Sequence, residues 1–108
     1  MIEMKEQLLK VGGIVVLRLC TGEEIITKIK GLTKSELILI NPFTFFVKPD
    51  GQIGIMPSTA IGDDNRDMFL NRNSIVLIMH PKEEVLEGYE KAISAIQIPG
   101  QKILVPTK

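Results

Sequence analysis

The sequence predicts a mainly β fold: a small, strongly bent, five-stranded antiparallel barrel with a short amino-terminal helix and a carboxy-terminal helix. The first supporting observation is the alternation of apolar and polar residues between residues 15 and 40, interrupted by turn-forming residues. The second is a polar turn, Asn71-Arg72-Asn73, followed by five apolar residues that are typical of a buried strand. The third is the length of 108 residues, which suits one small core.

Length and composition indicate one soluble domain. The 44% hydrophobic content is too high for a disordered chain, and the longest apolar run, residues 37–47, is interrupted by Asn41 and Pro42 and is too short to cross a membrane. The first ten residues mix charged and apolar side chains and lack the apolar stretch of a secretory signal, so we expect a cytoplasmic location. We assign the whole chain to a single domain, with a core at about residues 11–81 and a carboxy-terminal helix and tail at residues 82–108.

The charge balance argues against strong binding of nucleic acid through phosphates alone. Thirteen basic and thirteen acidic residues give a formal net charge of zero and a pI near 6.6. A protein that binds nucleic acid chiefly through its phosphates usually carries a basic excess. Any RNA site must therefore be local. Repetition of one subunit around an axis could still gather a few lysines and arginines at one place.

The first predicted elements are a helix and two strands. Apolar residues at helical spacing near the amino terminus predict a short helix that ends at Gly12-Gly13. Strands are expected at about residues 14–20 and 24–30, and Gly22 lies in the turn between them because glycine adopts positive φ without strain.

The third strand is expected to begin near Glu36 and to continue to Val47. Asn41-Pro42 should break or bulge it, because proline cannot donate a hydrogen bond to a ladder. The turn sequence Pro-Asp-Gly at residues 49–51 predicts a hairpin that returns through a fourth strand. Residues 57–67 are rich in turn formers and acidic residues, and they predict a surface excursion within or after that strand.

A fifth strand and a second helix complete the predicted fold. The strand at residues 75–79 ends at His80-Pro81, and apolar residues at helical spacing between Val85 and Ile96 predict an amphipathic helix. Residues 101–108 contain three consecutive aliphatic residues and are compatible either with an extra edge strand or with disorder.

The two segments of strand and turn resemble the two signature motifs of the Sm-like (LSm) family, in a divergent form such as those of microbes and their viruses (phages). The family has a glycine at the first turn and an aliphatic pair in the third strand, where this chain has Gly22, Leu37 and Leu39. Its second motif is an aliphatic residue, a short turn and an apolar strand, a pattern that Leu70 and residues 71–79 follow. SH3-like and OB barrels share the same strand count, so the motif order is what favours an SH3-like/Sm-like barrel.

The resemblance implies a ring. In the Sm-like family the fifth strand of one subunit pairs with the fourth strand of the next, and repetition of this contact closes a cyclic assembly. A fifth strand that is wholly apolar carries no charge to discourage such edge pairing. We therefore expect a cyclic homo-oligomer of about five to seven subunits. The residues expected at its interface are Ile53, Ile55, Met68, Phe69, Ile75, Val76, Leu77 and Ile78.

The resemblance also implies RNA binding at the turns before the third and fifth strands. The family's usual Asp and Asn are missing from the first turn, residues 33–36, and no aromatic residue is evident beside either turn to stack on a base. Simple chain reversal is an alternative explanation of residues 71–73, since asparagine tolerates left-handed geometry and caps turns. The candidate residues for contact with single-stranded RNA are Lys34, Ser35, Asn71, Arg72 and Asn73.

A second hypothesis is a ring-shaped interaction or assembly module that binds protein instead of RNA. The carboxy-terminal helix would serve this function if Leu86, Tyr89 and Ile93 formed an exposed apolar stripe.

Catalytic and metal-binding motifs are weak. The chain has one histidine and one cysteine, and a calcium-like spacing at residues 63–67 lacks the glycine and the closing glutamate of a calcium loop. We expect no enzymatic activity, no cofactor, no metal and no membrane association.

Overall fold

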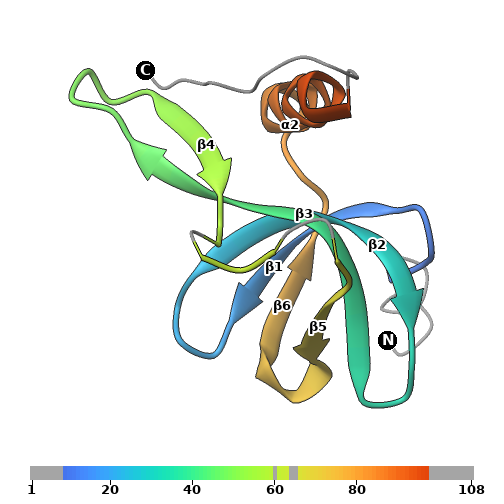
Figure 1. The fold of residues 1–108 in the computed structure, drawn as a ribbon. Helices are drawn as coiled ribbons and strands as arrows, with labels where there is room; N and C mark the ends of the chain where they lie inside the picture. The colour runs from blue at the N-terminus through green and yellow to red at the C-terminus, as the bar shows by residue number, and fades with distance from the viewer. Residues whose placement is uncertain (1–8, 60, 64–65, 98–108) are drawn as a thin grey trace.

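The computed structural model describes residues 9–59, 61–63 and 66–97 of the chain (Figure 1). These residues form a six-stranded antiparallel sheet and a carboxy-terminal helix. A 3₁₀ turn, η1 (Arg72–Ser74), joins the last two strands. The strands are β1 (Ile14–Leu19), β2 (Glu24–Leu32), β3 (Glu36–Val47), β4 (Ile53–Pro57), β5 (Met68–Asn71) and β6 (Ile75–Met79), and the helix is α2 (Glu83–Gln97).

The long strand β3 organises the sheet because it pairs with three other strands. The sheet order is β4-β3-β2-β1-β6, with β5 paired to the first half of β3 and β4 paired to the second half. In Figure 1, β3 runs from the bent lower part of the molecule into the β3–β4 hairpin, which projects from it. We call the projecting part of this hairpin, residues 45–57, the arm.

The sheet bends but does not close into a barrel within the described part of the chain. β5 pairs only with β3, and β6 pairs only with β1. The single fourth strand predicted from the sequence is instead two strands, because the turn-forming residues after Pro57 interrupt the ladder. The surface excursion predicted at residues 57–67 is thus the segment that separates β4 from β5.

β3 contains a bulge where the sequence predicted a break or a bulge. Two of its residues, Asn41 and Pro42, face the single residue Thr27 of β2. Asn41 has φ +49°, a left-handed conformation that asparagine tolerates better than most residues. The strand continues beyond the bulge to Val47, so the bulge redirects it without ending it.

The sheet carries an apolar core on each face. Alternation along β1 places Val15 and Leu17 in the core inside the bend, and Ile14 and Val16 on the opposite face, which α2 covers. The buried residues of the inner core are Leu9, Val15, Leu17, Ile25, Ile29, Leu37 and Leu39, and those of the outer core are Ile26, Phe43, Tyr89 and Ile93.

Tyr89 anchors α2 to the bulge. Its side chain is fully buried, and its ring meets Phe43 edge-on with 5.5 Å between the ring centroids. Its hydroxyl donates to the carbonyl oxygens of Ile40 and Asn41, at 3.0 and 2.9 Å. The same hydroxyl accepts a hydrogen bond from the backbone N–H of Lys28 at 3.0 Å. Backbone groups around the bulge are thereby satisfied by a side chain of the helix.

The exposed apolar stripe predicted on α2 is therefore wrong. Tyr89 and Ile93 are buried, and Leu86 is half-buried. Helical periodicity identifies an apolar side of the helix, and here that side packs on the outer core because the sheet offers it Ile26 and Phe43.

The predicted amino-terminal helix is not seen. Residues 1–8 lie outside the described residues, Leu9 packs in the inner core, and residues 11 and 12 form a turn in which Gly12 has φ +86°. The segment 101–108, considered as an edge strand, also lies outside the described residues.

Both tight turns predicted from the sequence are present. Gly22 has φ +99° between β1 and β2, and Gly51 has φ +88° at the tip of the arm. In the arm the backbone N–H of Lys48 donates to the carbonyl of Gln52 at 2.7 Å. Among the described residues, no helix is long and apolar enough to cross a membrane.

Candidate functional site at the paired turns

The turns before β3 and β6 are distant in sequence but adjacent in the structure. β5 pairs with the start of β3, which places Asn71 opposite Glu36. The backbone N–H of Arg72 donates to the carbonyl of Ser35 at 2.9 Å, and its guanidinium donates to the carbonyl of Thr33 at 2.7 Å. We call the surface formed by residues 33–36 and 71–74 the paired turns.

The paired turns bring together all five candidate RNA-binding residues. Lys34, Ser35, Asn71 and Asn73 are exposed, and Arg72 is half-buried. Among the described residues, the side chains of Lys34 and Asn73 make no hydrogen bond or ion pair, so both can meet a ligand.

Two of these candidate residues also stabilise the turns. The Asn71 side-chain oxygen accepts a hydrogen bond from the N–H of Asn73 at 2.9 Å, which caps η1. The Ser74 hydroxyl donates to the carbonyl of Asn71 at 2.6 Å, while Arg72 holds the neighbouring turn. Chain reversal, the alternative explanation of residues 71–73, is therefore part of what these residues do.

An exposed phenylalanine lies on the same strand face as Asn71. β5 alternates, so that Met68 and Leu70 pack against the inner core while Phe69 and Asn71 point away from it. Phe69 is 59% exposed and faces Ile38 of β3. Sequence reasoning found no aromatic residue beside the turns and placed Phe69 in the core and at a subunit interface. The spacing of two residues between Phe69 and Asn71 is the signal that could have found it.

Charge at the paired turns is close to balanced. Lys34 and Arg72 are basic, and Glu36 lies opposite Asn71 in the ladder. Nearby, Lys30 of β2 forms an exposed ion pair with Asp67, which precedes β5. A phosphate would meet only a weak positive field on one subunit, so repetition of the subunit is needed for strong attraction.

Two edges of the sheet have no strand partner in the described part of the chain: the outer edge of β6 and the outer edge of β4 and β5. On its other side β6 pairs irregularly with β1, because Ile75 faces Leu19 and Leu77 faces Arg18, which leaves Val76 between them without a partner in β1. Val76 is 57% exposed.

The eight residues expected at a subunit interface divide equally between outward and inward positions. Half of them are exposed on the strands, and half pack against the apolar cores of their own chain. The exposed residues are Ile53, Phe69, Val76 and Leu77, and the inward residues are Ile55, Met68, Ile75 and Ile78.

The buried hydroxyl of Tyr89 has a clearly shifted pKa. Burial raises the pKa of Tyr89 to about 12, and the hydrogen bond from the Lys28 N–H opposes part of that rise. This tyrosine packs α2 against the sheet and has no exposed face to offer a ligand.

Metal ligation finds no support in the described part of the chain, where no group of three or more His, Cys, Asp or Glu side chains could hold an ion. Asn65, the middle residue of the calcium-like spacing, lies outside the described residues.

No protein-family model matches the chain, and no curated protein is significantly similar to it in sequence.

Proposed function

We propose that this protein is a ring-forming Sm-like protein that binds single-stranded RNA through the paired turns and Phe69. The observation that carries the proposal is the placement of Phe69 and Asn71 on one outward face of β5, at the end where Lys34 is exposed. An aromatic ring, an amide and a lysine are the groups that stack on a base, hydrogen-bond to its edge and neutralise its phosphate.

Strand topology supports the ring. The chain returns to β1 through β6 and to β3 through β5, and this leaves β5 and β6 unpaired with each other. A second copy that places its β5 against the β6 of its neighbour would give both edges a partner, and repetition of that contact would close a ring. The paired turns flank β5 and β6, so the same repetition would gather several copies of Lys34 and Arg72.

Filter binding of oligo-U and oligo-A at low salt tests the RNA function. We expect Phe69→Ala to weaken binding about 10-fold, since stacking on one base contributes about 1–3 kcal/mol. Phe46→Ala is the matched control, because Phe46 is also an exposed phenylalanine but lies on the arm. The mass of the assembled particle is measured first, since Phe69 is also expected near the interface. Absence of binding by an intact wild-type ring would rule out this function.

Charge substitution tests the position of the phosphate contacts. Lys34→Gln should weaken binding several-fold and reduce its salt dependence, whereas Lys48→Gln removes the same charge from the tip of the arm and should change neither. Equal effects of the two substitutions would mean that the paired turns are not the binding surface.

A proline substitution tests the ring. Val76→Pro removes a backbone donor from β6 and should release monomers or aggregates, while Val76→Thr keeps the donor and the β-branched shape and should assemble normally. Sedimentation velocity distinguishes these outcomes. Assembly of the proline variant into particles of wild-type mass would count against strand pairing at this edge.

The exposed apolar surface of the arm supports a second candidate function, in which the protein is a ring-shaped assembly module that binds protein and not RNA. Among the described residues, the arm exposes a group of large apolar side chains, and such groups are typical of surfaces that bind another protein. The two functions separate in the filter-binding experiment, because the module predicts a stable ring that retains no oligonucleotide. The exposed apolar residues of the arm are Phe45, Phe46, Val47, Ile53 and Met56.

A further inference from the structure

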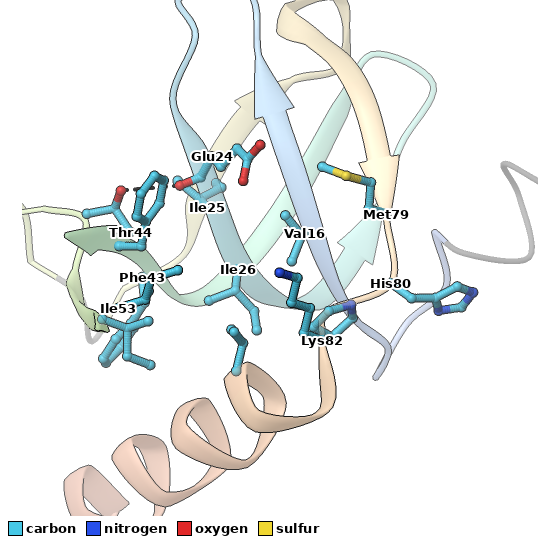
Figure 2. Close-up of a pocket in the computed structure, with 14 residues that line it drawn as sticks. Val16, Glu24, Ile25, Ile26, Phe43, Thr44, Ile53, Met79, His80 and Lys82 are labelled. Atoms are coloured by element: carbon cyan, nitrogen blue, oxygen red, sulfur yellow. Dashed lines mark hydrogen bonds between the residues drawn. The ribbon is translucent and has the colours of Figure 1, made fainter. Parts of the chain in front are cut away.

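A groove of about 240 Å³ lies between the arm and the start of α2 (Figure 2). Val16, Ile26 and Phe43 line its floor, and they come from three neighbouring strands. Ile53 of the arm lines one side, and Val85 of the first turn of α2 lines the other. The groove is thus mainly apolar, with a floor continuous with the outer core, and its lining also includes the polar residues Glu24, Thr44, His80 and Lys82.

The arm side of the groove is not covered by any described residue. Ile53 is 55% exposed and Phe45 is 44% exposed, and both line the groove. Apolar side chains that converge on a concave surface and remain open to water favour an occupant that is itself apolar.

We propose that residues 101–108 of the same chain bind in this groove as a short extended segment. Val85 lies twelve positions before Gln97, the last residue of α2. Those positions span about 18 Å along the helix at 1.5 Å per residue. An extended chain returning along α2 covers that distance in about six residues. Residues 103–105 therefore reach the groove.

The sequence of this segment matches the groove in shape and polarity. Ile103-Leu104-Val105 is aliphatic and rich in β-branched residues, which favour an extended backbone. Alternation in an extended chain would direct Ile103 and Val105 into the groove and Leu104 away from it. Ile103 and Val105 would thus supply the apolar side chains that the groove requires.

Charge favours the same path. Residues 98–108 contain two lysines and no acidic residue, whereas α2 carries four glutamates and one lysine. A segment returning along α2 would bring Lys102 beside the exposed glutamates of the helix, an attraction that salt would weaken. The glutamates are Glu83, Glu84, Glu87 and Glu90.

Disulfide trapping in the full chain tests the contact. With Cys20→Ser to remove the native thiol, Ile53→Cys and Val105→Cys should cross-link within one chain under mild oxidation. The matched control pairs Val105→Cys with Lys34→Cys, which lies in the paired turns and does not line the groove. We expect cross-linking in the groove pair about 10-fold faster or more, because a docked segment holds its thiol at a high effective concentration. Equal rates in the two pairs would overturn the proposal.

A mixing experiment distinguishes binding within the chain from binding to a neighbouring copy. The Ile53→Cys and Val105→Cys variants, each without Cys20, are mixed and oxidised. Cross-linked dimers forming as fast as the intramolecular product would show that the segment binds another copy, which also overturns the proposal. The test needs neither RNA binding nor a ring, so its failure is separable from failure of the proposed function.

A second measurement leaves the described core unchanged. The double variant Ile103→Asp/Val105→Asp should uncover the groove and raise the fluorescence of a hydrophobic dye several-fold over wild type. The matched variant Gln101→Asp/Thr107→Asp adds the same charge outside the aliphatic residues and should bind much less dye. Wild-type fluorescence in the first variant would contradict occupation of the groove.

Discussion

The two halves of β3 are similar in composition but differ in their surroundings. Before the bulge, Leu37 is fully buried and Leu39 is 6% exposed. After it, Phe45 is 44% exposed and Val47 is 63% exposed. The first half lies between β2 and β5 above the inner core, whereas beyond Thr44 the strand pairs only with β4. The burial of an apolar residue in β3 therefore depends on how many strands and helices pack around it, and its apolar character alone does not determine it.

The difference also suggests that the two regions have different stability. A two-stranded hairpin is marginally stable by itself, and the arm is such a hairpin beyond Thr44. The bent part of the sheet has neighbours on both sides of β3 and a continuous core. Local opening should begin in the arm.

The largest expected effect comes from truncating the buried half of β3. Leu37→Ala should lower the free energy of unfolding by about 2–5 kcal/mol, because it leaves a cavity in the inner core. Phe45→Ala removes a larger side chain from the exposed half and should cost only about 1 kcal/mol. Urea unfolding measures both values. Equal losses would show that the arm is as well packed in solution as the bent sheet.

The next effect concerns the junction between the two regions, where Tyr89 clamps α2 to the bulge. The pKa of Tyr89 is about 10 in the unfolded chain and about 12 in the folded chain. Its contribution to the free energy of unfolding is therefore complete below pH 10 and is lost as the pH rises to 12. The loss should be about 2–3 kcal/mol, at about 1.4 kcal/mol for each pKa unit. The chain has one tyrosine and no tryptophan, so ultraviolet absorbance of tyrosinate follows this residue directly.

Tyr89→Phe is the control for that titration. It should remove the decline between pH 10 and 12 and cost about 1–3 kcal/mol at neutral pH, because backbone groups at the bulge lose their partner. Ionisation near pH 10 in the folded wild type would contradict the buried position of the hydroxyl.

The smallest effect comes from two matched glycines, one in each region. Gly22 and Gly51 both have positive φ, and an added Cβ would meet no other atom at either position. Alanine at each should therefore introduce a similar backbone strain of about 1 kcal/mol. Gly22→Ala should lower global stability by that amount, whereas Gly51→Ala should mainly loosen the arm. Amide hydrogen exchange distinguishes a loss of global stability from local opening of the arm. A loss of global stability in Gly51→Ala would mean that the arm unfolds together with the bent sheet.

The elements that the sequence predicted correctly are those that depend on local chemistry. Turn residues located Gly22 and Gly51, alternation located β1 and β2, and Pro42 marked the bulge. The division of the fourth strand was only partly foreseen, because a run of turn formers does not say whether a strand resumes beyond it. Pairing with β3 decides that, and such pairing is a long-range contact.

The orientation of α2 could not be predicted from its own periodicity. Helical spacing groups its apolar residues, but whether they cover a core or face a partner depends on the sheet that accepts them. Tyr89 was therefore expected on an exposed stripe and is instead fully buried.

The candidate site was partly predictable. The resemblance to Sm-like motifs grouped the two turns, and the hydrogen bonds from Arg72 to residues 33 and 35 place them together. The exposed position of Phe69 beside the turns was missed, because it depends on which face of β5 meets the inner core. Met68 and Leu70 decide that face, and their contacts are visible only in the folded chain.

The clamp at Tyr89 acts on main-chain atoms, and this makes one position useful for chemical labelling. Lys28 contributes its peptide N–H to the tyrosine, while its ammonium group takes no part in that contact. A dye or a surface linker attached to the Lys28 amine would report on the seating of the helix while leaving intact the bond that holds it.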